Sequence, residues 1–227
     1  MLCARHARQI AGIVLAAGGI WGSACVAATD AETAFSELEE RLLTSDFSLE
    51  FDIVASGPYP AQLAGNTTLS GANHASVKAD GVFAGQSASI RLRAHDGRMK
   101  GGNGVLEFDQ ATPGALREAM VIGLTRMGLL HNLAMMSSGA PPDHADGGVR
   151  DWVQATNLKL ETDALIDGKP AVVFSFTVVV SGEDSGSATL WVHPETGLPL
   201  KREQVVSFEN GEMRVTETYP ALTIIAR

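Results

Sequence analysis

Residues 113–136 read PGALREAMVIGLTRMGLLHNLAMM, and this stretch decides how the rest of the chain is arranged. Its apolar side chains recur at spacings of three and four residues, which predicts a helix with a continuous apolar face. Gly123 and Gly128 are poor helix residues, so we expect one long helix or two shorter ones. The stretch also holds four of the seven methionines, a residue type that is over-used on surfaces that accept varied apolar partners.

Patterns typical of β-strands lie on both sides of this stretch. Phe47, Leu49, Phe51 and Ile53 alternate with polar residues, which predicts a half-buried strand. Further strands are expected at 62–70, 75–83, 87–94, 99–108, near 152, and at 171–180, 188–193, 200–208 and 212–219. Turn residues separate them, and Asn210-Gly211 is a strong hairpin signal. Closely spaced consecutive strands favour an antiparallel arrangement.

A short helix is expected before the first strand. Thr29 or Asp30 is a candidate cap, and an apolar face follows at Phe35, Leu38 and Leu42. About ten strands and two helical segments together predict an α+β fold with one large curved antiparallel sheet.

Two interpretations of residues 113–136 follow from this order of elements. The stretch is either an ordinary core helix or a lid over an apolar cavity, because a sheet with two helical segments cannot cover both of its faces. We call residues 113–136 the lid. Under the second interpretation, which predicts ligand binding, the contact residues are Leu116, Met120, Leu124, Met127, Leu130 and Leu133 of the lid and Phe47, Leu49 and Phe51 of the sheet.

The N-terminus has the pattern of a secretory signal peptide over residues 1–28. Arg5 and Arg8 precede an apolar stretch at 10–21, and Val26-Ala27-Ala28 forms a small-residue cleavage site. A retained membrane helix is the alternative, although this apolar stretch is short. Cleavage leaves a single domain of 199 residues, 29–227, and losing the two arginines changes the net charge from −9 to −11. Such an acidic chain is a poor partner for nucleic acid.

The cysteines leave a second choice open. Cys3 and Cys25 are the only two, so cleavage after Ala28 removes every thiol. Alternatively, residues 22–25 (GSAC) form a bacterial lipobox, and a lipidated Cys25 anchors the domain to a membrane.

Motifs that would carry catalysis are absent from the sequence. It contains no G-x-S-x-G elbow, phosphate loop or H-E-x-x-H helix, and no two histidines stand at metal-ligand spacing. Asp143, His144 and Asp146 cluster in a loop that we interpret as solvated, and the glycine-rich residues 101–104 as a turn. We therefore expect a binding protein without enzymatic activity, metal or cofactor.

The C-terminal third resembles a known superfamily. Residues 188–192 (ATLWV) lead into 193–199 (HPETGLP), then Lys201-Arg202, and a closing hairpin ends at Glu217-Thr218-Tyr219. This motif resembles one found in the outer-membrane lipoprotein carrier (LolA/LolB-like) superfamily, which includes sensor domains of the RseB type. The order of elements is also similar: a signal, a helix, strands, a helical insert and further strands.

The resemblance implies an unclosed antiparallel half-barrel whose mouth is covered by helices, with an apolar cavity for acyl chains. Together with the signal, it leads us to expect a periplasmic protein, or one anchored to the outer membrane through Cys25, whose partners are lipid or lipoprotein acyl chains. We also expect a monomer. A protein-interaction or stress-sensor module without lipid is the alternative. Such carriers usually have an Arg-Pro pair in the early hairpin, where this chain reads Gly71-Ala72-Asn73-His74. The resemblance therefore assigns the gating role to no residue here.

Overall fold

The computed structural model describes residues 20–137, 148–162 and 164–225, with side chains described from residue 30 onward. Six strands precede the lid: β1 (Asp46–Ser56), β2 (Ala61–Ser70), β3 (His74–Phe83), β4 (Gln86–His95), β5 (Arg98–Gly102) and β6 (Glu107–Ala111). Six follow it: β7 (Val153–Leu160), β8 (Ala164–Ile166), β9 (Lys169–Val180), β10 (Glu183–Val192), β11 (Pro199–Phe208) and β12 (Gly211–Ile225).

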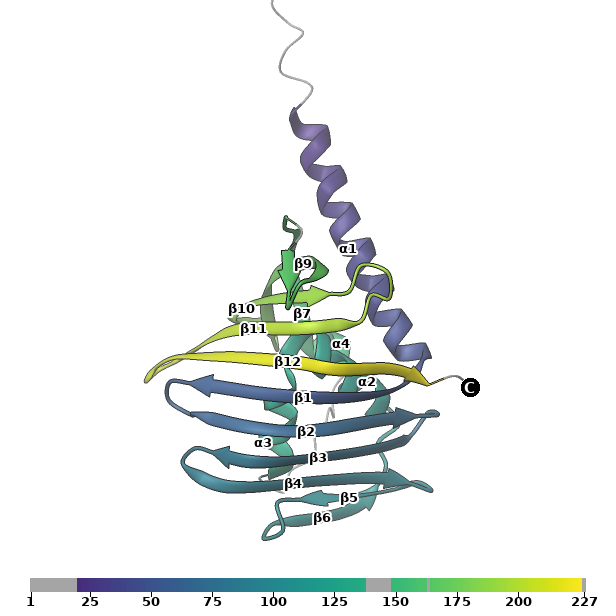
Figure 1. Ribbon diagram of the computed structural model, residues 1–227, viewed down its shortest axis with the longest axis vertical. Coiled ribbons are helices and arrows are strands. Elements are labelled where there is room, and N and C mark those ends of the chain that lie inside the picture. The colour runs from purple at the N-terminus through teal and green to yellow at the C-terminus, as the bar shows by residue number, and fades with distance from the viewer. Residues whose placement is uncertain (1–19, 138–147, 163, 226–227) are drawn as a thin grey trace, which may run out of the picture.

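These strands form one 12-stranded sheet in the order β6-β5-β4-β3-β2-β1-β12-β11-β10-β9-β7, with β8 beside β9 (Figure 1). Each half is an antiparallel meander. The halves join where the first and last strands pair, with Asp46 opposite Ile225 at one end and Ser56 opposite Arg214 at the other. Since β6 and β7 occupy opposite ends of this order, the sheet is unclosed. The predicted α+β class and unclosed antiparallel sheet are confirmed.

The strand predictions hold, with three differences. The segment expected at 99–108 is two strands, because residues 103–106 form the turn between β5 and β6. The short strand β8 was not predicted. Strand β12 also continues past Pro220, which stands at an irregularity of the β1 ladder and beyond the last β11 pair, Lys201 with Thr218. A proline is tolerated there because no ladder partner requires its missing N–H.

The helices are α1 (Ile20–Thr44), α2 (Leu116–Ile122), the π-helix η1 (Gly123–Met127), α3 (Leu129–Ser137) and α4 (Val149–Trp152). The lid is therefore broken, as its glycines predicted. Gly128 ends η1 at φ +93°, a conformation that favours glycine, whereas Gly123 begins the π-helix. Helix α1 begins earlier than the expected cap at Thr29 or Asp30, since residues 20–28 contain no proline and continue the helix.

The lid helices and α4 lie on one face of the sheet (Figure 1). Helix α3 packs against β4 and β5, whereas α1 packs against β7 and places Phe35 edge-on against Phe174 and Phe176 of β9. The inward residues of both meanders and the apolar faces of the helices form one core. Within the described ranges, no helix has the length and apolar composition that a membrane span requires.

Candidate functional site

The residues predicted to line a site come together under the lid. Phe47, Leu49 and Phe51 point inward from β1, as their alternation predicted. The lid residues meet them in the same apolar core, in which Met127 is partly buried and the others are buried: Leu116, Met120, Leu124, Leu130 and Leu133. The juxtaposition of lid and strand is therefore as expected.

Side chains fill the space between lid and sheet at this point. The void bounded by Phe51, Val77, Met120, Leu133 and their neighbours has a volume of about 10 Å³. That volume corresponds to about one water molecule and is far too small for an acyl chain. The expected acyl-sized cavity is thus not open at this position, and a ligand would enter only if the lid moved.

Polar anchors hold the lid in place, and the first is Arg117 of α2. Its Nε and Nη2 donate to the Gly71 carbonyl at 2.9 and 2.6 Å, and Nη1 donates to the Ser45 carbonyl at 2.6 Å. Nη2 also forms an ion pair with Asp46 at 2.8 Å, in which both side chains are nearly buried. An arginine therefore reaches the early hairpin turn after all, but from the lid, whereas the carrier pattern places one in the hairpin itself.

The second anchor joins the π-helix to α1. Arg126 Nε donates to Glu39 Oε1 at 2.7 Å, and its Nη1 donates to the Val153 carbonyl at 2.9 Å. Thr125 Oγ1 donates to the same Glu39 oxygen at 2.9 Å. The Glu39 carboxylate is buried, so these bonds compensate for its removal from water.

The third anchor is a buried network at the break in the lid. Glu217 of β12 accepts the backbone N–H groups of Leu129 and Leu130 at 3.0 and 2.9 Å, and Tyr219 Oη donates to it at 2.6 Å. Arg202, opposite Glu217 in the ladder, donates to Gln204 and to the Arg126 carbonyl. The sheet thereby binds the first amides of α3.

The electrostatics of this network follow from burial. Arg202 and Glu217 are both 0% exposed. Burial lowers the pKa of Arg202, an effect that the negative charge of Glu217 opposes. Burial, then Glu217, raises the pKa of Tyr219 well above its ordinary value, so the phenol keeps the proton that it donates. We assign this cluster to fastening the lid, since Glu217 and both terminal nitrogens of Arg202 bond within the cluster or to the lid backbone. Arg202 Nε is buried without a hydrogen-bond partner.

Sequence reasoning did not identify these anchors. Arg202 and Glu217 belong to the motif on which the family resemblance rests. Their roles, however, depend on their facing each other on the adjacent strands β11 and β12. A usable signal existed, because both stand at inward positions of their strands, where apolar residues are the rule.

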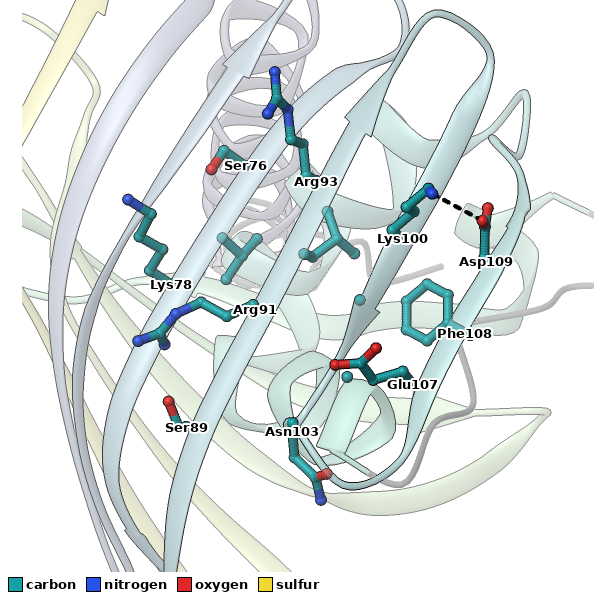
Figure 2. A pocket seen from close by; sticks show the side chains of 15 residues that line it. Ser76, Lys78, Ser89, Arg91, Arg93, Lys100, Asn103, Glu107, Phe108 and Asp109 are labelled. Carbon is teal, nitrogen blue, oxygen red and sulfur yellow. Dashed lines mark ion pairs between the residues drawn. The ribbon is translucent and has the colours of Figure 1, made fainter.

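A second concave feature lies on the opposite face of the sheet. We call it the outer groove; it spans β3–β6 and has a volume of about 580 Å³ (Figure 2). Its walls carry four cations on positions that alternate with buried residues, and Gly101 and Gly102 leave part of the floor without side chains. The cations are Lys78, Arg91, Arg93 and Lys100.

Two of the four cations are neutralised. Asp80 pairs with Arg91 at 2.8 Å and Asp109 pairs with Lys100 at 3.0 Å. Hydrogen bonds from Arg91 and Ser89 lower the pKa of Asp80, and the bond from Lys100, followed by that from Arg98, lowers the pKa of Asp109. Lys78 and Arg93 form no ion pair within the described part of the chain. Lys78 and Arg93 are therefore positive charges outside any of these ion pairs, and Glu107 adds one negative charge to the same lining.

The structure locates some of the histidines and of the other residues that were candidates for a site. His74 and His95, which no sequence spacing connects, stack on each other at the end of β3 and β4. His131 of α3 packs against Trp152. The turn expected at 101–104 lies at 103–106 instead, because Gly101 and Gly102 pair on both sides as the end of β5. Asp143, His144 and Asp146 lie outside the described residues. Cys25 falls within α1, and its lipidation stays a prediction.

Comparison with known proteins finds similarity at the level of fold. No protein-family model and no curated protein matches the chain. LprF from Mycobacterium bovis shares 12% identity over 87% of this chain and 97% of its own, with a TM-score of 0.49. A LolA superfamily protein from Nitrosomonas europaea shares 11% identity over 87% and 94%, with a TM-score of 0.35.

A chain of the MucA/MucB complex of Pseudomonas aeruginosa shares 18% identity over 87% of this chain, with a TM-score of 0.48. This chain spans only 58% of that one. The comparisons thus find a distant structural similarity to proteins that include a LolA superfamily member, at low sequence identity.

Proposed function

We propose that this chain is an exported binding protein that holds a lipid or lipoprotein acyl group between the sheet and the lid. The observation that supports the proposal is the construction of the lid. Its inner surface is apolar and rich in methionine, and its fastening is polar, through Arg117, Arg126 and Glu217. A segment held by a few polar anchors can be displaced without unravelling the sheet.

Ligand entry between Phe51 and Met120 requires the lid to move, because the void among the described residues at this point is only about 10 Å³. An acyl chain that takes the place of Met120, Leu133 and Met136 would restore the apolar contacts of the strands. Each buried methylene contributes about 0.8 kcal/mol, so about ten of them contribute about 8 kcal/mol toward opening the lid. Methionine side chains are flexible and can repack around such a chain.

Uptake of a fluorescent fatty acid tests the proposal. The wild-type protein is expected to show saturable uptake, and Arg117→Gln should accelerate it roughly tenfold if the lost anchor contributes about 1.4 kcal/mol to the closed lid. Arg98→Gln is the matched control, since it removes an exposed ion pair with Asp109 on the edge of the sheet. The proposal fails if neither wild type nor Arg117→Gln takes up the probe. Equal uptake rates in all three proteins would reject lid displacement as the route.

The proposed site of action is the periplasm, after cleavage behind Ala28, or the outer membrane if Cys25 is lipidated. We expect a monomer there. Intact-protein mass spectrometry on material from the native host distinguishes the two N-termini and detects any co-purifying lipid.

The outer groove favours a second candidate function, an interaction module that docks an acidic segment of an envelope protein. Lys78 and Arg93 supply charge complementarity, and the groove lies beside the edge strand β6. A synthetic Glu-rich peptide is expected to bind at low salt. The double variant Lys78→Gln/Arg93→Gln should weaken binding at least tenfold, whereas Lys169→Gln, on an exposed part of β9, should leave it unchanged. Equal loss in both variants would show a non-specific charge effect and exclude the groove.

A further inference from the structure

The geometry points to a binding site for a divalent transition-metal ion, of the Zn²⁺ class, formed by His74, His95 and Asp96. The three side chains are exposed on the face of the sheet opposite the lid, and their ligand atoms all lie within 4.8 Å of one another. The site is separate from the lid anchors and from the residues that line the outer groove.

The backbone holds these three residues in fixed relation. Ala75 pairs with Ala94 in the β3–β4 ladder, so the next positions outward, His74 and His95, stand opposite each other. Side chains at such opposed positions have Cβ atoms about 5 Å apart, within reach of a shared ion. Asp96 and Gly97 form the tight turn into β5 at φ +52° and +75°, which places the third ligand directly beside the second. All three ligands therefore stand on paired strands or on the two-residue turn that joins β4 to β5.

The side chains are close to coordinating positions. The two imidazole rings stack with centroids 4.6 Å apart and an interplanar angle of 14°, and His95 Nδ1 lies 2.8 Å from Asp96 Oδ2. Around a tetrahedral zinc ion with bonds of about 2.1 Å, ligand atoms are roughly 3.4 Å apart. The required movement is thus at most about 1.5 Å. Side chains that are 51% and 82% exposed, as His95 and Asp96 are, can make it by rotation.

The ligand chemistry selects the class of ion. Imidazole nitrogen suits Zn²⁺, Cu²⁺ and Ni²⁺, whereas Mg²⁺ and Ca²⁺ prefer sites made only of oxygen. Two histidines and a carboxylate provide three ligands, and water would complete a four-coordinate shell. Arg93, two residues before His95 on the same face, opposes cation binding, and the carboxylate of Asp96 offsets that charge. Because all three ligand residues are exposed, a bound ion would exchange with ions in the solvent.

The position of the site gives a bound ion a structural effect. His74 follows directly after the turn at 71–73, whose Gly71 carbonyl accepts two bonds from Arg117 of the lid. An ion held between His74 and His95 would brace the end of β3 that adjoins the turn receiving this anchor.

Calorimetric titration with ZnCl₂ tests the inference on tag-free protein previously dialysed against a chelator. We expect one Zn²⁺ per chain, with His74→Ala and His95→Ala each weakening binding at least tenfold and Asp96→Asn weakening it less. His144→Ala, which removes the histidine of the 143–146 cluster, is the matched control and should bind as wild type. Because all three ligands are exposed, the variants are expected to keep the wild-type circular dichroism spectrum.

Long-range imidazole nitrogen NMR provides an independent readout. Only the signals of His74 and His95 should shift on addition of Zn²⁺. Undiminished affinity in His74→Ala and His95→Ala, loss in His144→Ala alone, or half an ion per chain through two copies would each overturn the site.

Discussion

At the scale of single residues, the buried charges of Glu217 and Arg202 are the unusual feature of this protein. A carboxylate at an inward strand position costs several kcal/mol unless donors surround it. Glu217 has three donors, two from the lid backbone and one from Tyr219, and Arg202 faces it across the ladder. The same groups that make the charge tolerable therefore fix the start of α3.

Replacing Tyr219 with Phe tests this network. The variant loses the 2.6 Å bond to a charged acceptor, so the free energy of unfolding should fall by about 1.5–3 kcal/mol. The folded protein holds the Tyr219 proton more tightly than the unfolded chain, whose pKa is about 10. The contribution of the protonated Tyr219 to the free energy of unfolding is thus complete below about pH 10, and it is lost as the pH rises further. Urea unfolding at about pH 8 and about pH 11 should show this decline in the wild type and a smaller one in Tyr219→Phe. Identical declines would contradict the assignment.

Gly128 tests the break in the lid. A Cβ at this position would lie 2.8 Å from Arg202 Nη1 and 3.0 Å from Glu217 Oε1, at a φ of +93°. Gly128→Ala should therefore lower the free energy of unfolding by about 1–3 kcal/mol. Gly114→Ala is the matched control, since its Cβ would meet nothing within 4 Å. A Gly128→Ala protein as stable as the control would mean that the network does not require the close approach of the backbone.

At the scale of elements, polar contacts fasten both the lid and the edge strand β6. The lid has Arg117, Arg126 and Glu217, and the short edge strand β6 has Asp109, which receives Arg98 and Lys100 of β5. Strand β6 has no fully buried side chain and so depends more on such contacts than a central strand does, whereas the lid also buries residues such as Val121 and Leu124 in the core. The apolar core then determines where the lid and β6 lie, and the polar contacts determine how easily each of them is displaced from the rest of the sheet.

Removing the carboxylate of Asp109 tests this for β6. Asp109→Asn should speed amide hydrogen exchange in β5 and β6 while leaving the global free energy of unfolding close to that of the wild type. Because the pKa of Asp109 is lowered in the folded protein, its contribution is present above about pH 4 and is lost as the pH falls below that. The difference between variant and wild type should therefore shrink in acid. Asp52→Asn, on the exposed face of β1, is the control. Equal exchange in β6 of both variants would reject the anchoring role.

At the scale of the whole molecule, the β1–β12 ladder joins two meanders from opposite ends of the chain, and α1 closes the core beside it. Phe35, Leu38 and Leu42 of α1 are buried against the sheet. All three follow the proposed cleavage site at Ala28, and the domain boundary there stays a prediction.

Truncation tests the proposed domain boundary. A chain that begins at Thr29 should unfold in one cooperative transition, with a midpoint close to that of the full-length protein. A chain that begins at Asp46 loses the α1 face and the partner of Arg126, and should bind a hydrophobic dye and lose its cooperative transition. Calorimetry on both distinguishes the outcomes. A fully cooperative chain from Asp46 would show that α1 is not part of the domain.

The sequence by itself determined the local features of this protein. Alternation placed Phe47, Leu49 and Phe51 on the inner face, Asn210-Gly211 marked a hairpin, and the glycines of the lid predicted its break at Gly128. These features depend on residues a few positions apart, so periodicity and turn chemistry are sufficient to predict them.

Only the tertiary structure decided which distant residues meet. The pairing of β1 with β12, the opposition of Arg202 and Glu217, the reach of Arg117 to Gly71 and the stacking of His74 on His95 all depend on strand register and helix placement. Register is set by the packing of the whole core, in which a shift of one residue would turn every inward side chain outward. For the same reason, the filled space beneath the lid could not be foreseen from an apolar pattern, since the pattern states which side chains face inward and not how closely they pack.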